Sequence, residues 1–282
     1  MGCLGIEPAR NIAKVAQEKG IETLVEFFGK GLAQKLAGSR QADLILGNNV
    51  FAHAPDTNDF VAGLRALLKP NGRIILEFPY AADFIEKSEF DTIYHEHVFY
   101  FSLTALKPLF ERHGLSIFHV ERLSIHGGSL RLFSCVDGAH ARQASVSELL
   151  EVEQQKGLNA ARYYEGFAER VHELKRELLK LLGDLKQSGK CIAAYGASAK
   201  GSTLLNFFGL GSETLDFIAD RSSYKQGRLS PGTHIPIVEP NWLLEKMPDY
   251  TLLLTWNFAD EILAQQKEYL ARGGKFIIPI PI

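Results

Sequence analysis

Four consecutive residues, Tyr94, His95, Glu96 and His97, bring a phenol, two imidazoles and a carboxylate together between apolar neighbours. An imidazole titrates near neutral pH, so it can take up a proton and release it again in each catalytic cycle. Imidazole and carboxylate are also ordinary zinc ligands, although His95 and His97 lack the i, i+4 spacing that puts two ligands on one helix face. This segment could therefore transfer protons, bind a metal or form a polar surface turn. Proton transfer is the favoured hypothesis.

The elements before this segment alternate between strands and helices. We expect strands at Cys3–Ile6, Glu22–Phe27, Asp43–Leu46 and Arg73–Phe78, and helices at Ala9–Lys19, Gly31–Ala37 and Asp56–Leu68. Pro70-Asn-Gly72 is a turn signal before the last of these strands. Such alternation predicts βαβ units and a parallel sheet.

Ligands bind such sheets at the carboxyl ends of the strands. Glu7, the amides Asn48 and Asn49, and Glu77–Tyr80 follow predicted strands and are therefore candidate positions. An acid placed like Glu7 commonly accepts hydrogen bonds from the two ribose hydroxyls of a nucleoside. The alternative for Glu7 is a charge that caps the helix after it.

A helical stretch follows Gly138. Ser145-Val-Ser-Glu148 predicts a capping box for a helix that ends near Gln155. A second helix is predicted from apolar residues that recur every three or four positions and mark one buried stripe: Leu158, Ala161, Tyr164, Phe167, Val171, Leu174, Leu178, Leu181 and Leu185. We expect a packing helix that joins two lobes, and a partner-binding helix is the alternative.

A second α/β pattern begins after Gly189. It predicts strands at Lys190–Tyr195, Leu215–Asp220, Tyr250–Thr255 and Lys275–Pro279, and helices at Ser202–Phe208, Pro240–Lys246 and Ala259–Ala271. Between the first strand and helix lies Tyr195-Gly-Ala-Ser-Ala-Lys-Gly201. Its backbone N–H groups, the helix N-terminus and Lys200 would suit a diphosphate, although a structural turn is the alternative and neither the Walker nor the Gly-x-Gly-x-x-Gly spacing is present.

Several of these motifs together resemble one family. Gly5–Asn11, Asp43–His53 and Pro70–Phe78 are similar to the second, fourth and fifth strand regions of class I S-adenosylmethionine-dependent methyltransferases. With Tyr94–His97, Ala194–Thr203 and Asp220–Pro236, the chain resembles the nucleotide-sugar C-methyltransferases, which methylate a ring carbon of a deoxy-keto-hexose on thymidine diphosphate. The resemblance covers nearly the whole chain.

The resemblance implies roles for the opening cluster. The family pattern Tyr-x-Glu-His maps onto Tyr94, Glu96 and His97, with His97 as the base that removes the proton next to the sugar ketone, Tyr94 and Glu96 as binding or orienting groups, and no role for His95. His53 falls on a family active-site histidine near the ketone. Glu7, Asn48 and Asn49 become candidates for cofactor binding.

The same resemblance implies a diphosphate-sugar site in the second α/β region. Its candidates are Tyr195, Ser198, Lys200, His126, Arg221 and Lys225. For Arg221 and Lys225 a solvated loop is the safer reading. His126 opens His126-Gly-Gly-Ser-Leu-Arg131, which predicts a strand edge where paired glycines permit close approach, and a structural role is the favoured reading for it.

The resemblance predicts three regions. They are an incomplete methyltransferase domain over residues 1–140, a helical connector over 141–188, and a smaller Rossmann-like domain over 189–282 that binds the sugar nucleotide. The family's small zinc-binding domain and its glycine-rich cofactor loop do not precede Glu7. The open explanations are a shortened reading of the gene, which the intact catalytic residues favour, a cut chain, or a natural remnant that binds sugar nucleotide without methylating it. We expect weak or absent S-adenosylmethionine binding by these 282 residues alone.

Composition narrows the partners. A net charge of -2 without basic runs gives no electrostatic footprint for nucleic acid, and no apolar run approaches the roughly 20 residues that span a bilayer. Cys3, Cys135 and Cys191 are few and far apart, which favours a reducing cytoplasm over a disulfide framework, and no secretory signal is visible. A nicotinamide-dependent sugar-nucleotide enzyme is the remaining rival, and the missing dinucleotide fingerprint counts against it.

Overall fold

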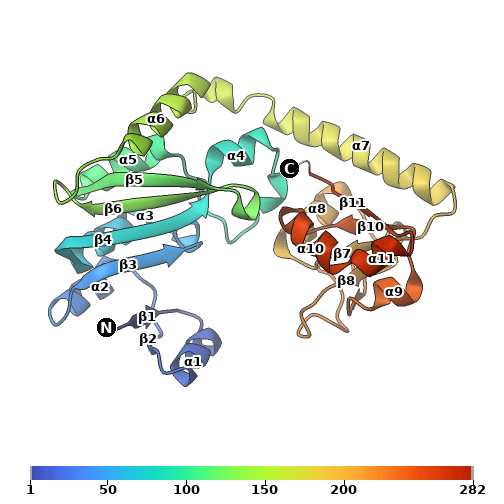
Figure 1. Ribbon diagram of the computed structural model, residues 1–282, viewed down its shortest axis with the longest axis horizontal. Helices are drawn as coiled ribbons and strands as arrows, with labels where there is room; N and C mark the ends of the chain where they lie inside the picture. The colour runs from blue at the N-terminus through green and yellow to red at the C-terminus, as the bar shows by residue number, and fades with distance from the viewer. Residues whose placement is uncertain (1, 281–282) are drawn as a thin grey trace. The chain divides into compact units, whose positions relative to one another are not determined.

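The computed structural model describes residues 2–280, which form two compact units (Figure 1). The first unit runs through Tyr80 and adds Val98–Leu123 and Ser129–Tyr163. The second unit contains Ala81–His97, Ser124–Gly128 and the chain from Tyr164 onward. The segment that carries His97 therefore packs with the C-terminal portion of the chain, although it lies early in the sequence.

The first unit contains two sheets and the helices that flank them. Its elements are β1 (Leu4–Ile6), α1 (Arg10–Glu18), β2 (Glu22–Leu24), α2 (Lys30–Ala37), β3 (Ala42–Asn48), the 3-10 helix η1 (Phe51–His53), α3 (Thr57–Leu67), β4 (Leu68–Pro79), α5 (Leu103–Arg112), β5 (Leu115–Leu123), β6 (Ser129–Val136), α6 (Ala144–Lys156) and the 3-10 helix η4 (Ala161–Tyr163). β1 and β2 form a parallel pair, and a separate sheet has the order β3-β4-β6-β5.

The four-stranded sheet is mixed. β3 and β4 run parallel, whereas β6 is antiparallel to both β4 and β5. The predicted strands do pair in parallel, β1 with β2 and β3 with β4. The sheet also contains β5 and β6, which the strand–helix alternation did not predict and which run antiparallel because a short connection reverses the chain between them. The α/β class is confirmed.

The turn predicted at Pro70–Gly72 lies within β4. Ala42 pairs with Leu68 and Leu44 pairs with Arg73, so β4 advances by five residues where β3 advances by two. The extra residues bulge from the ladder at the proline, which has no N–H to donate. Residues 70–72 therefore form a bulge within β4, where a separate turn before the strand was expected.

β3 lies at one edge of its sheet and pairs there with β4 alone among residues 2–280. Several large apolar side chains on and near this strand are exposed: Phe27, Leu44, Leu46 and Val50. The Leu46 side chain is 64% exposed. The first unit thus has an open strand edge with apolar side chains beside it.

The second unit is built around a parallel sheet. Its elements are α4 (Ala81–Glu86), the 3-10 helices η2 (Phe90–Thr92) and η3 (Ile125–Gly127), α7 (Phe167–Gln187), β7 (Ile192–Tyr195), α8 (Ala199–Phe208), β8 (Ile218–Ala219), β9 (Ile237–Val238), α9 (Trp242–Lys246), β10 (Tyr250–Leu253), the 3-10 helix η5 (Trp256–Phe258), α10 (Ala259–Gln265), α11 (Lys267–Ala271) and β11 (Lys275–Ile277). The strand order is β11-β10-β7-β8-β9, and every pair is parallel. All residues of β7 are buried, as expected for a strand covered on both faces.

Two predictions about the helices were wrong. The first is the capping box at Ser145: the N-cap of α6 is Gln143, and the Ser145 hydroxyl instead lies 2.8 Å from Nδ1 of His119 and accepts the N–H of Val120. The Ser145 hydroxyl thus bonds to residues of β5 and does not cap its own helix.

The second concerns the apolar stripe. α7 begins only at Phe167, after Gly166 in a left-handed conformation, so Leu158, Ala161 and Tyr164 lie outside it. Within α7 the buried residues are Val171, Leu178 and Leu182, while Leu181 is 44% exposed. Because Leu181 and Leu182 are both leucines, spacing alone could not select the buried one.

Other bounds also differ. The strand predicted at Leu215–Asp220 shrinks to β8, and the helix predicted at Ala259–Ala271 is divided into α10 and α11 near Gln266. His126 lies in η3 and not on a strand edge, because the backbone there is left-handed at His126 and Gly127 before β6 begins.

Candidate active site

His97 ends a compact turn that starts at Thr92. Its backbone N–H donates to the carbonyl oxygen of Tyr94 at 3.0 Å, and its ring Nδ1 lies 3.0 Å from the carbonyl oxygen of Thr92. A carbonyl oxygen only accepts hydrogen bonds, so Nδ1 is the protonated nitrogen in this contact. The neutral ring then keeps its lone pair on Nε2.

Tyr94 covers the Nε2 side of the same ring. The Tyr94 hydroxyl lies 3.2 Å from Nε2, and the two ring centroids are 4.4 Å apart. Burial of the half-buried phenol raises its pKa, and the negative charges of Glu96 and Asp91 act in the same direction. The phenol therefore stays protonated and can donate to Nε2, so the structure brings Tyr94 and His97 together.

Glu96 and His95 lie on the exposed side of the turn. Glu96 Oε1 is 3.9 Å from His95 Nε2, and the His95 side chain is 88% exposed. Within residues 2–280, no group of three His, Cys, Asp or Glu side chains is arranged to hold a metal ion. The contacts of this turn are those of a hydrogen-bonded histidine and tyrosine.

His53 is held by an aromatic cluster of the first unit. It ends η1, whose Phe51 is fully buried and stacks on Phe101 at a centroid distance of 4.5 Å. The carbonyl oxygen of the intervening Ala52 accepts the N–H groups of Val98 and Phe99, the two residues that follow His97. The loop of His53 and the chain that leaves the His97 turn are thus tied by two hydrogen bonds.

The cofactor candidates lie at the carboxyl ends of β1 and β3, as expected. Glu7 Oε1 accepts the N–H of Ala9 at 2.8 Å, which is the contact expected of an acid that caps the following helix. This contact uses one carboxylate oxygen, Oε1, and does not involve Oε2. Asn48 ends β3, and Asn49 has a positive φ of 54° while its N–H donates to Glu77 at 2.7 Å. The Glu77 carboxylate itself is buried and paired with Arg131.

The turn between β7 and α8 uses its side chains for local contacts. The hydroxyl of Ser198 accepts the N–H of Gly201 at 3.0 Å and caps α8. The Tyr195 hydroxyl accepts from Gln266 at 3.4 Å, and burial raises the pKa of that phenol while the Arg221 charge lowers it. Tyr195 and Arg221 therefore lie close enough to interact.

The two loop cations differ in their surroundings. Lys225 donates to the carbonyl oxygen of Ala197 at 2.8 Å and lies 3.6 Å from Asp220. Arg221 is an exposed side chain 3.4 Å from the amide oxygen of Gln265. Lys225 is thus fixed beside the β7–α8 turn, whereas Arg221 has the solvated setting expected for a loop residue.

Lys200 points to a buried cluster. Its ammonium lies 4.5 Å from the centroid of the Trp256 ring, and Trp256 Nε1 donates to Asp91 at 2.7 Å. Glu89, Asp91 and Trp256 were missed by the sequence analysis. The acids lie in a polar stretch that reads as surface, and Trp256 lies 165 residues from Asp91 in the chain, so no local pattern could have joined them.

His126 packs beside η5, with its ring perpendicular to Phe258 at a centroid distance of 5.5 Å. The two glycines after it allow close approach, as predicted, but by acidic side chains: a Cβ at Gly127 would lie 2.6 Å from Glu89, and one at Gly128 would lie 2.4 Å from Asp83. These glycines let the η3 turn fit against the Ala81–His97 segment.

The sequence profile of the C-methyltransferase C-terminal domain matches residues 124–281, and that of a methyltransferase domain matches residues 3–120. C-methyltransferase NovU from Streptomyces niveus is 40% identical over 280 residues, which are 99% of this chain and 67% of that protein. The chain therefore belongs to the S-adenosylmethionine-dependent C-methyltransferases, as the resemblance in the sequence predicted.

Solved methyltransferases show more distant likeness. A possible histamine N-methyltransferase from Thermotoga maritima is 16% identical, with a TM-score of 0.38 over 48% of this chain and 73% of its own. N-methyltransferase NodS from Bradyrhizobium japonicum is 13% identical, with a TM-score of 0.35 over 47% of this chain and 72% of its own.

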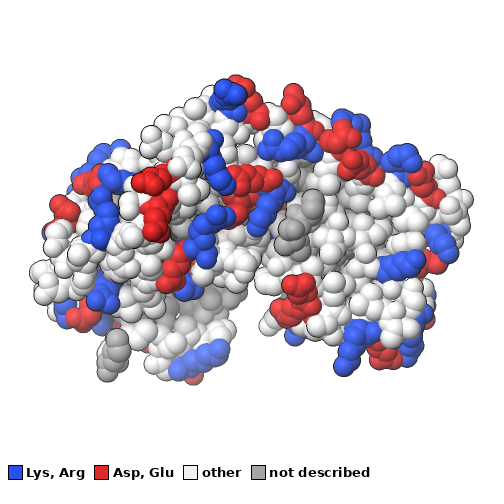
Figure 2. All heavy atoms as spheres, turned by 45° about the horizontal axis from the view of Figure 1, so that its top comes forward, with Lys and Arg blue, Asp and Glu red and all other residues white. Residues whose placement is uncertain are grey.

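The helices and the surface charge also bear on the predictions from composition. In residues 2–280, no helix is both long and apolar enough to cross a membrane. On the face shown in Figure 2, acidic and basic side chains are interspersed, in line with the net charge of -2.

Proposed function

We propose that this C-methyltransferase acts on a nucleotide-linked keto-deoxysugar and methylates the carbon next to the ketone, with His97 as the general base. The observation that carries the proposal is the pair of contacts on the His97 ring. Nδ1 is held by the Thr92 carbonyl oxygen, and Nε2 faces the Tyr94 hydroxyl. A base needs a fixed tautomer and a lone pair for the substrate proton; the Thr92 contact supports the first, and the second requires the Tyr94 hydroxyl to turn from Nε2 to the sugar when the substrate binds.

His97, Tyr94 and His53 have different roles in this proposal. His97 Nε2 removes the proton from the carbon next to the ketone, and the electron pair of that C–H bond moves into an enolate. The Tyr94 hydroxyl and His53 are hydrogen-bond donors for polar groups of the sugar, where a donor to the developing oxyanion lowers the barrier. When bound, S-adenosylmethionine supplies an electrophilic methyl group that the enolate carbon can take.

Cofactor and substrate are assigned to different residues. Glu7 has one free carboxylate oxygen for a ribose hydroxyl, and Asn48 and Asn49 lie at the end of β3. Tyr195, Arg221 and Lys225 surround the turn after β7 and are proposed to bind the sugar nucleotide, with His126 and Ser198 supporting this region. Cys3, Cys135 and Cys191 are free thiols, and we place the reaction in the cytoplasm.

The test is methyl transfer with a thymidine-diphosphate keto-deoxysugar and S-adenosylmethionine labelled in its methyl group, with the cofactor in large excess because this chain is expected to bind it weakly. His97→Ala is expected to lower the rate by about 10²- to 10⁴-fold, the usual contribution of a general base. His95→Ala is the matched control, because His95 is exposed in the same turn, and it should keep the rate. Equal rates for the His97→Ala chain and the unsubstituted chain would refute the proposal, and no incorporation by the latter would favour the non-catalytic sugar-nucleotide binder.

A further inference from the structure

A buried charged cluster lies beneath the His97 turn, entirely within the second unit. Glu89 and Asp91 are 1% and 0% exposed. Asp91 Oδ2 accepts from Trp256 Nε1 at 2.7 Å, and the Lys200 ammonium lies over the Trp256 ring, 4.5 Å from its centroid. Glu89 Oε1 and Asp91 Oδ1 have no hydrogen-bond partner.

Carboxylates buried in this way need a compensating cation. Burial raises the pKa of Glu89 to about 7 and that of Asp91 to about 6, and in both cases the positive charge of Lys200 acts most strongly against this rise. Burial lowers the pKa of Lys200, while Asp91 and Glu89 raise it. Lys87, Asp83 and Asp91 are the other charged groups that act on Glu89. Lys200 is therefore the main positive charge acting on both acids, and its ammonium lies over the Trp256 ring that donates to Asp91.

The cluster connects directly to the base. Asp91 precedes Thr92, whose carbonyl oxygen holds His97 Nδ1 and also accepts the N–H of Tyr94. The Thr92 hydroxyl donates to the carbonyl oxygen of Glu89 at 2.9 Å. Any shift of Asp91 would therefore move the acceptor that fixes the His97 ring.

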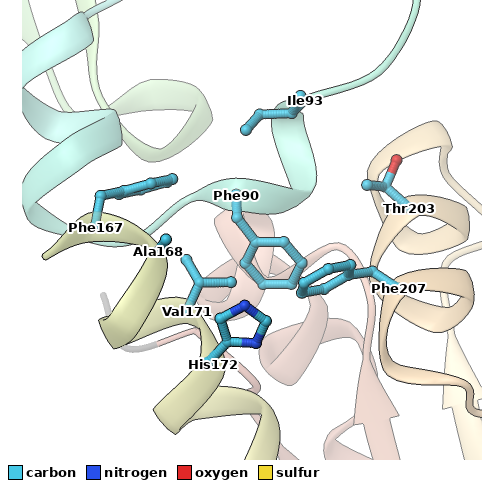
Figure 3. A pocket seen from close by; sticks show the side chains of 8 residues that line it. All are labelled: Phe90, Ile93, Phe167, Ala168, Val171, His172, Thr203 and Phe207. Carbon is cyan, nitrogen blue, oxygen red and sulfur yellow. The ribbon is translucent and has the colours of Figure 1, made fainter. Parts of the chain in front are cut away.

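The residue between the two acids anchors the same segment by apolar contact. Phe90 stacks on Phe208 of α8 at a centroid distance of 5.1 Å and also contacts Phe207. Figure 3 shows Phe90 pointing toward Val171 and His172 of α7 and toward Phe207, along an apolar pocket of about 290 Å³. Helix α8 therefore holds this segment twice, by apolar packing at Phe90 and by charge at Lys200.

We propose that Lys200 is a positioning residue: it holds Asp91, and through Thr92 the ring of His97, and it does not bind the diphosphate of the substrate. The inference rests on the proposed role of His97 as the base. It gives Lys200 a different role from the diphosphate ligand expected from the sequence, and it leaves Lys225 and Arg221 as the cations for that group.

Lys200→Met in the full chain tests this inference. Lys180→Met is the matched control, since Lys180 is an exposed lysine of the same unit that pairs with Asp184 at the surface of α7. The first readout is the affinity for thymidine diphosphate, measured by calorimetry. The second is the chemical shift of the His97 ring protons, assigned by their absence in His97→Ala, which needs no substrate.

Lys200→Met is expected to move the His97 ring signals and to change thymidine diphosphate affinity by less than about twofold, whereas Lys180→Met should change neither. Lys200→Arg keeps the charge and should retain the His97 signals of the unsubstituted chain. If Lys200→Met does not fold, Lys200→Arg is the variant to measure. Adding Asp91→Asn to Lys200→Met removes the unpaired buried charge and should restore part of the lost stability.

Two results would overturn the inference. One is a loss of thymidine diphosphate affinity of about tenfold or more in Lys200→Met, which is the size expected for a lost charged contact. The other is an unchanged set of His97 signals. If the unsubstituted chain does not bind thymidine diphosphate, the substrate in the proposed function is wrong, and the His97 signals still decide the role of Lys200.

Discussion

The carbonyl oxygen of Thr92 lies 3.0 Å from Nδ1 of His97, and this contact determines which ring nitrogen carries the proton in the neutral imidazole. A backbone carbonyl oxygen can only accept a hydrogen bond, so it selects the tautomer with the proton on Nδ1. The contact depends on the turn from Thr92 to His97, and that turn is anchored by its neighbours Phe90 and Asp91.

Tyr94→Phe should slow methyl transfer by about tenfold while the protein stays folded. The substitution removes one hydroxyl that faces Nε2 of His97 at 3.2 Å, and a single hydrogen bond near a reacting group contributes about 1 kcal/mol or more. Steady-state kinetics should place the loss in kcat. A rate equal to that of the unsubstituted chain would show that the hydroxyl has no part in the reaction.

The buried acid Glu89 should make stability fall as the pH rises. Its pKa is about 7 in the folded chain, against the model-compound value of 4.5, because burial disfavours the carboxylate. The folded state therefore binds more protons than the unfolded state between these values, and the free energy of unfolding should drop by about 3 kcal/mol as the pH rises through 7. Urea unfolding of Glu89→Gln at pH 5 and pH 8 should show a smaller drop; the same drop in both chains would exclude Glu89 as its source.

Gly127→Ala should destabilise the second unit strongly. Gly127 has a φ of +94°, and an added Cβ would lie 2.6 Å from the Glu89 carboxylate. Gly138→Ala is the control for backbone strain alone, because its φ is +78° and nothing lies within 4 Å of the added carbon. We expect a loss of about 1 kcal/mol at Gly138 and about 3 kcal/mol at Gly127, measured by chemical unfolding. Equal losses would mean that the contact with Glu89 yields without cost.

Glu153→Ala should destabilise the first unit by about 3 kcal/mol. The Glu153 carboxylate is fully buried and accepts the Tyr80 hydroxyl and the N–H groups of Leu103 and Thr104, which begin helix α5. Removal takes away the carboxylate that these three groups share, two of them in buried residues. Glu151→Ala, an exposed acid on the same helix, should have little effect in the same unfolding experiment. A Glu153→Ala chain as stable as the Glu151→Ala chain would contradict this assignment.

Local patterns predicted much of the fold. The strand–helix alternation located β1 through β4 and four of the five strands in the sheet of the second unit, missing the edge strand β9, because buried strands and amphipathic helices have distinct periods. Local sequence patterns failed where a residue distant in the sequence determines a hydrogen bond or the burial of a side chain. Ser145 bonds to a neighbouring strand in place of its own helix, and the choice between Leu181 and Leu182 depends on the sheet packed against α7.

The candidate site shows the same limit. The Tyr94–His97 pair is local, so its chemistry could be read from four consecutive residues. The support beneath it joins Asp91 to Trp256 and Lys200, which are distant in sequence, and only the folded chain brings them together. The sequence therefore could not show that the Lys200 ammonium lies over the Trp256 ring, and the assignment of Lys200 to a diphosphate was made without that contact.

The most direct measurement is hydrogen exchange at the carbon next to the ketone of a thymidine-diphosphate keto-deoxysugar in deuterated water, without methyl donor. Proton removal by His97 does not require the methyl group, so we expect enzyme-dependent deuterium uptake at that carbon, reduced at least about 100-fold in His97→Ala and retained in His95→Ala. Uptake at an undiminished rate in His97→Ala would show that another group is the base.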